Sequence, residues 1–90
     1  MEYAVLVVHT IQDYRKWRPL FDADEEARLE AGMTEPRVYR NVDRPNELII
    51  QVSTASLRLA REFLASPEPE KRMADAGVAA PPTIYFLETV

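Results

Sequence analysis

One histidine is the strongest acid–base candidate in this sequence of 90 residues. His9 ends an apolar run and comes shortly before a helical pattern, and sites often form where such elements meet. An imidazole titrates near neutral pH, so His9 could act as a general base or as a donor that orients a ligand. The alternative is structural, with the ring bonded to a backbone carbonyl or to Asp13. We take His9 as the best single catalytic candidate.

Aromatic side chains follow His9 at helical spacing. Tyr14, Trp17 and Phe21 recur at i, i+3 and i+7, and they could line a pocket for a planar ligand. The same stripe could instead fill the core of the domain. Pro19 interrupts the helical pattern and favours the pocket, because a broken helix can open space over a sheet.

Further pocket candidates come from later parts of the chain. Tyr39 and Gln51 could donate hydrogen bonds to a ligand carbonyl, while the neighbouring Arg40 could face a partner subunit. Met73 has an adaptable side chain that could close a pocket. A surface position on an edge strand explains the polar residues equally well. The ligand-pocket candidates are therefore His9, Trp17, Phe21, Tyr39, Gln51 and Met73.

Metal and cofactor sites are not expected. An acidic run could hold a hard cation, but a solvated helix face with Arg28 nearby is the preferred interpretation. This run comprises Asp22, Asp24, Glu25, Glu26 and Glu30. With one histidine and no cysteine, the chain lacks the ligands that transition metals prefer. It also contains no phosphate loop or nucleophile elbow.

Charge and hydropathy exclude two classes of partner. The net charge is −4, and the eleven Lys and Arg residues are scattered, so nucleic acid binding is not expected. The N-terminal apolar run is too short to span a bilayer, and it lacks the positive flank of a signal peptide. We therefore expect a cytoplasmic protein without a membrane partner.

Stretches of alternating and helical pattern predict the elements that position these residues. The first strand, residues 2–9, has apolar side chains on both faces, with Val5 and Val7 on one and Leu6 and Val8 on the other. Gly32 and Gly77 each mark a helix end. The predicted helices cover residues 13–18, 19–31, a segment that starts after Thr54 or Ser56, and 66–77; the later strands cover 37–42, 48–52 and 83–88.

This order predicts a single domain over residues 1–90 with an α+β, ferredoxin-like βαββαβ fold. Right-handed crossovers place strands one and three in the middle of a four-stranded antiparallel sheet, with the helices on one face. The other face would remain apolar and uncovered, which is more than a monomer usually exposes. A two-fold homodimer with its sheets packed face to face would bury that surface.

Several segments resemble the dimeric α+β barrel superfamily, which includes small antibiotic-biosynthesis monooxygenases, polyketide cyclases and many uncharacterised proteins. They are HTIQDYRKW at 9–17, Phe21–Asp22, Gly32, VYR at 38–40, DRPN at 43–46, FLASP at 63–67 and AGV at 76–78. The resemblance covers nearly the whole chain and implies the same fold. In its monooxygenase branch, catalysis on an activated aromatic substrate needs no metal or flavin. No catalytic residue of the family is matched by position.

Two functions follow from the residues and the resemblance. The first is a small homodimeric barrel that binds a small apolar or aromatic ligand. The alternative is a cofactor-independent monooxygenase- or cyclase-like enzyme acting on an aromatic or polyketide-type substrate, with His9 as acid, base or orienting donor. A buried His9 facing a cavity beside Trp17 would favour the enzyme, and a packed interior with His9 on the surface would favour the binding protein.

Overall fold

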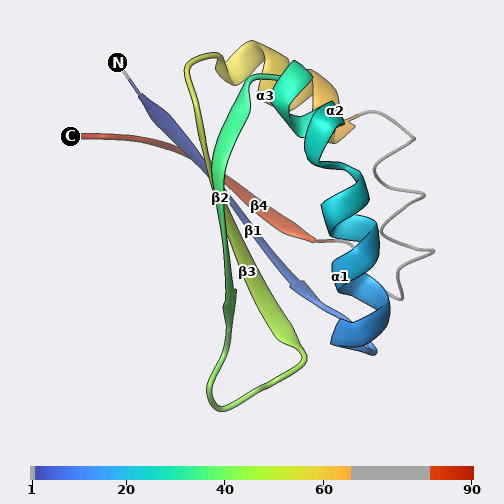
Figure 1. Ribbon diagram of the computed structural model, residues 1–90. Helices are drawn as coiled ribbons and strands as arrows, with labels where there is room; N and C mark the ends of the chain where they lie inside the picture. Colours follow the sequence, from blue (N-terminus) through green and yellow to red (C-terminus); the bar gives the residue numbers. More distant parts are fainter. Residues whose placement is uncertain (1, 66–81) are drawn as a thin grey trace.

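The computed structural model describes residues 2–65 and 82–90 of the chain, shown in Figure 1. The predicted helix over 66–77, with Met73, lies outside the described residues. The elements follow the predicted order of strands and helices. They are β1 (Tyr3–Thr10), α1 (Tyr14–Ala23), α2 (Glu25–Glu30), β2 (Met33–Arg40), β3 (Glu47–Thr54), α3 (Leu57–Ala65) and β4 (Thr83–Glu88).

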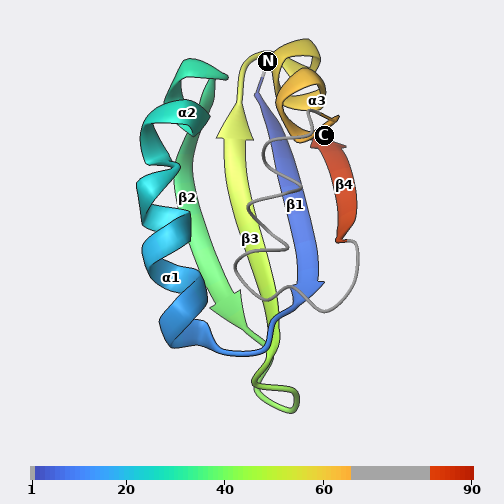
Figure 2. The same cartoon turned by 90° about the vertical axis from the view of Figure 1, so that its right-hand side faces the viewer.

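The four strands form one antiparallel sheet in the order β2-β3-β1-β4, which confirms the predicted central and edge positions. Figure 1 shows the described helices on one side of this sheet. In Figure 2, α1 and α2 run along the β2 side, while α3 lies over the opposite side near one end of β1 and β4. Between these two groups of helices, the middle of the sheet is the floor of the site.

Alternation along the central strands separates two faces of the sheet. Val5, Val7 and His9 of β1 face the helices and are buried, while Leu6 and Val8 face the other way and are half-buried. β3 repeats this pattern, with Leu48, Ile50, Val52 and Thr54 buried. The prediction that β1 carries apolar side chains on both faces is confirmed.

The first helix does not break at Pro19, so the predicted boundary is wrong. α1 is continuous across this residue, and the turn comes at Asp24 instead. Pro19 and Arg15 are both exposed, so water can reach the Arg15 carbonyl that loses its intrahelical partner. Asp13 caps the helix as expected, since its carboxylate accepts a hydrogen bond from the Arg15 amide at 2.9 Å.

The second strand begins four residues earlier than predicted, at Met33 rather than 37. A register shift between Thr34 and Arg37 accommodates Pro36, which an edge strand tolerates because one side of it needs no partner. Within the shift, Glu35 has a positive φ of 53°. Gly32 also has a positive φ, 80°, which fits its predicted place just after the preceding helix.

Candidate functional site

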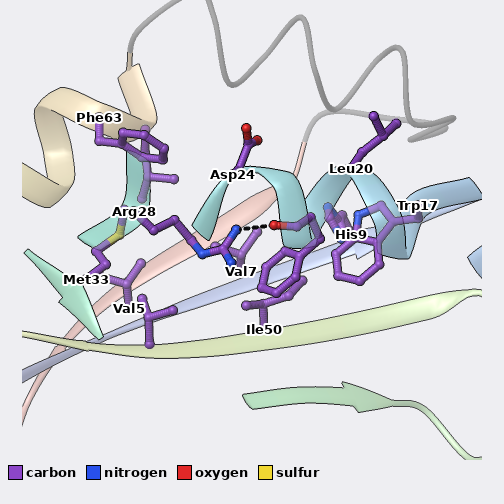
Figure 3. A pocket seen from close by; sticks show the side chains of 13 residues that line it. Val5, Val7, His9, Trp17, Leu20, Asp24, Arg28, Met33, Ile50 and Phe63 are labelled. Atoms are coloured by element: carbon purple, nitrogen blue, oxygen red, sulfur yellow. Dashed lines mark hydrogen bonds between the residues drawn. The ribbon is translucent and has the colours of Figure 1, made fainter. Parts of the chain in front are cut away.

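A pocket of about 90 Å³ lies between α1, α2 and the helix-facing side of the sheet. Side chains of β1 and β3 form its floor, and α1, α2, Met33 and α3 provide its walls. Most of the described residues that line it are apolar, and the polar ones are His9, Asp24 and Arg28. Figure 3 shows these side chains around the pocket. An apolar pocket with a few convergent polar groups is the usual form of a small-molecule site.

His9 projects from the end of β1 toward α1 and is only 6% exposed. Its ring meets the Trp17 ring edge to face, with centroids 5.7 Å apart. Neither Nδ1 nor Nε2 has a hydrogen-bond partner among the residues that the structure describes. Burial lowers the pKa of His9 below its ordinary value, so the imidazole is neutral at pH 7. One nitrogen of a neutral imidazole is an acceptor, so His9 can take a hydrogen bond or a proton from a ligand.

Trp17 and Phe21 form an aromatic wall along α1. Their rings are stacked with centroids 4.8 Å apart and planes inclined by 19°. The four-residue spacing places them on neighbouring turns of one helix face. The ring centroids of Tyr14 and Trp17 are 5.9 Å apart, but Tyr14 does not line the pocket. Of the three aromatic residues at helical spacing, only Trp17 and Phe21 are therefore pocket residues.

Arg28 is a pocket residue that the sequence analysis missed, because it was expected on a solvated helix face. It is only 9% exposed, and its guanidinium carbon lies 3.8 Å from the centroid of the Phe21 ring. Its NH1 group donates a hydrogen bond of 2.7 Å to the Phe21 carbonyl. Burial lowers the pKa of Arg28, and the carboxylates of Asp24, Glu25 and Asp22 act in the opposite direction.

A signal for Arg28 was present in the sequence. Trp17, Phe21, Asp24 and Arg28 follow one another at i, i+4, i+7 and i+11, which is the spacing of one helix face. They all line the pocket, although the turn at Asp24 separates α1 from α2. The predicted helix over 19–31 already contained Phe21, Asp24 and Arg28, but Arg28 was assigned to its solvated face. The other members of the acidic run, among them Glu26, are exposed, and Asp24 alone of the run lines the pocket.

The remaining sequence candidates lie elsewhere. The structure brings His9, Trp17 and Phe21 together, but Tyr39 and Gln51 project from the opposite face of the sheet, so they do not line this pocket. Tyr39 is 46% exposed there. Met73 lies outside the described residues. Within residues 2–65 and 82–90, no group of three metal-ligating side chains comes together, and no helix is long and apolar enough to cross a membrane.

No family model matches the chain, and no curated protein matches it significantly. Several solved structures, in contrast, match the fold of the chain. A Bordetella bronchiseptica protein assigned provisionally as an antibiotic biosynthesis monooxygenase has a TM-score of 0.80 and 14% identity, covering 99% of this chain and 97% of that one. SnoaB, a cofactor-independent oxygenase from Streptomyces nogalater, has a TM-score of 0.75 and 13% identity, covering 99% and 93%. Rv0793 from Mycobacterium tuberculosis has a TM-score of 0.72 and 21% identity, and the match covers 100% of this chain and 96% of that one.

At these identities the likeness establishes the fold. Several of the neighbouring structures are described as antibiotic biosynthesis monooxygenases, and SnoaB is described as a cofactor-independent oxygenase. The predicted fold class is therefore confirmed.

Proposed function

We propose that this protein binds a small aromatic molecule in the pocket between α1, α2 and the sheet. The observation that carries the proposal is His9, a buried imidazole without a hydrogen-bond partner among the described residues, facing an apolar pocket walled by Trp17 and Phe21. A buried polar group without a partner is costly, so its retention at a pocket wall has a natural explanation in ligand binding.

Tryptophan fluorescence tests this proposal directly, because Trp17 is the only tryptophan in the chain. Titration with a library of aromatic and polyketide-like compounds should change the emission and raise the melting temperature. A ligand at 100 times its dissociation constant stabilises the folded state by about 2.7 kcal/mol. Aliphatic compounds of similar size are the control. If no aromatic compound changes either signal, the proposal fails.

A second candidate function is oxygenation of the bound aromatic without a cofactor. The supporting observations are the neutral, buried His9 beside Trp17 and the fold shared with SnoaB, a cofactor-independent oxygenase. In this function His9 takes a proton from a hydroxyl group of an electron-rich aromatic, and the resulting anion adds dioxygen at a ring carbon. His9 returns the proton to form a hydroperoxide, and loss of water from the hydroperoxide leaves a quinone. The surrounding apolar side chains keep water away from that anion.

An oxygen electrode separates the two functions. With an electron-rich polycyclic phenol as substrate and a chelator present, the enzyme would show protein-dependent oxygen uptake that His9→Gln abolishes. Uptake that survives His9→Gln would remove His9 from the mechanism. Binding without uptake leaves the ligand-binding function alone.

We also propose that the protein is a homodimer joined through the open face of the sheet. That face carries Leu6, Val8, Ile49, Tyr85 and Leu87, and the last two are 50% and 43% exposed. An exposed apolar surface of this kind is typical of an interface between subunits. Sedimentation of a stable monomer at micromolar concentration would contradict the dimer.

Three further proposals retain the expectations from the sequence. The chain is one domain over residues 1–90, it is cytoplasmic, and it has no nucleic acid partner. The net charge of −4 supports the last of these, since phosphate backbones select basic surfaces.

A further inference from the structure

Two hydrogen-bonding groups of different character flank the aromatic wall of the pocket. His9 contacts Trp17 edge-on at 5.7 Å between ring centroids, and the Arg28 guanidinium covers Phe21 at 3.8 Å. In Figure 3 His9 and Trp17 lie toward one end of the pocket, and Arg28 lies between them and Met33. A ligand that lies along the wall therefore meets an imidazole beside Trp17 and a cation beside Phe21.

The hydrogen-bonding capacity of Arg28 is incompletely used. A guanidinium has five N–H donors, and within the described part of the chain one hydrogen bond is formed, to the Phe21 carbonyl. The Asp24 carboxylate also lines the pocket, but in Figure 3 it points away from the guanidinium. A buried cation is stabilised by an anion that accepts its remaining N–H groups, and carboxylates accept two at once.

His9 has the complementary requirement. Both of its ring nitrogens lack partners among the described residues, and the acceptor nitrogen can receive a hydrogen bond from a hydroxyl group. Val5, Val7 and Ile50 lie on the floor of the same pocket, so the body of the ligand must be apolar. The positions of these groups define an order along the ligand: anion, aromatic body, hydroxyl.

We infer that the ligand is an aromatic hydroxy acid whose carboxylate binds Arg28 and whose distal hydroxyl donates to His9. This inference rests on the proposed ligand-binding function and adds the chemical class of the ligand. It makes Arg28 a residue that determines specificity, because a neutral aromatic of the same size offers no acceptor to the unused N–H donors of the guanidinium.

Isothermal titration of the unmodified protein at pH 7 with four related compounds tests the inference. They are naphthalene, naphthol, naphthoate and a hydroxynaphthoate with its two groups on opposite rings. We expect hydroxynaphthoate to bind most tightly, with the loss of either group weakening binding roughly tenfold, as for one hydrogen bond to a charged or buried partner. Equal affinity for naphthoate and naphthalene would overturn the inference while leaving the proposed function intact. If none of the four binds, the proposed function itself fails for this class of aromatic compound.

Variants assign each group to its residue. Arg28→Gln should remove the roughly tenfold advantage of naphthoate over naphthalene and leave that of naphthol over naphthalene unchanged, and His9→Leu should do the reverse. Arg28→Lys keeps the charge but loses the planar pair of donors, so it should retain part of the preference for naphthoate. If Arg28→Gln does not fold, Arg28→Lys and the four compounds on the unmodified protein still decide the outcome.

Arg18 offers a matched control. Its guanidinium carbon lies 5.7 Å from the Phe21 centroid, but its side chain is 42% exposed and hydrogen-bonded to Tyr14 and Asp22. Arg18→Gln should leave the preference for naphthoate unchanged. If Arg18→Gln and Arg28→Gln reduce this preference equally, the effect is one of overall charge and the assignment of Arg28 is wrong.

Discussion

The two faces of the sheet have similar apolar composition but very different burial. On the helix-facing side Val5 and Leu48 are fully buried, whereas on the open side Tyr85 and Leu87 remain about half exposed. The same strands supply both faces, because successive side chains point in opposite directions. The comparison shows that, among residues 2–65 and 82–90, only one of the two apolar surfaces that the strands create is buried.

The faces also differ in where polar groups occur. The covered side carries the buried His9 and contacts the buried Arg28, which lie on the apolar pocket. The open side carries Gln51 and Tyr39, which are accessible to water. Polar groups in a dry environment interact more strongly with a ligand than those at the surface. The covered face is therefore the one suited to chemistry, and the open face is suited to association.

The largest difference between the faces should appear in core truncations. Leu48→Ala, on the covered face, should lower the free energy of unfolding by about 2–5 kcal/mol, because it leaves a cavity under the helices. Ile49→Ala, its neighbour on the open face, should cost the isolated subunit less, about 1 kcal/mol, since little packing is lost there. Urea denaturation at low protein concentration measures both. Equal losses would contradict the distinction between the faces.

The next effect concerns association. Ile49→Asp places an unpaired carboxylate in the proposed interface and should raise the dimer dissociation constant about 100-fold or more. Sedimentation velocity over a range of concentrations measures the change. Lys16→Asp, on an exposed part of α1, is the control and should leave association unchanged. A dimer that tolerates Ile49→Asp is not joined through this face.

The smallest effect distinguishes a functional His9 from a structural one. His9→Leu should raise the free energy of unfolding at pH 7 by about 1 kcal/mol, because it removes two buried nitrogens that have no partner among the described residues. The same variant should lose the hydroxyl preference in binding. A decrease in stability at pH 7 would show that His9 supports the fold instead.

The pH dependence of the free energy of unfolding gives a second comparison of the unmodified protein with His9→Leu. Its pKa is lower in the folded than in the unfolded state, so the unfolded state binds more protons between the two values. The free energy of unfolding is therefore not reduced by His9 protonation above about pH 6.5, the ordinary histidine pKa, and it declines as the pH falls through the folded value. His9→Leu should lack this decline when unfolding is followed between about pH 7 and 5.

Local patterns predicted most of the fold. Alternation in β1, the Asp13 cap and the positive φ of Gly32 depend on neighbouring residues only, so the sequence shows them. The break expected at Pro19 was wrong because packing of Trp17 and Phe21 on either side of it stabilises a continuous helix.

The candidate site was only partly predictable. His9, Trp17 and Phe21 were found because residue type and spacing mark them. Arg28 was missed, since a charge on a helix is usually solvated and its burial depends on tertiary packing. Tyr39 and Gln51 lie on the open face, which sequence alone does not reveal, because alternation along a strand does not indicate which face the helices cover.

The hydrogen bond from Arg28 to the Phe21 carbonyl spans the turn at Asp24, so it joins the end of one helix to the body of the next. The carboxylate of the proposed ligand would accept the other N–H groups of the same guanidinium, so binding leaves this hydrogen bond in place. A single side chain would then contact both the ligand and the carbonyl that precedes the turn between the two helices.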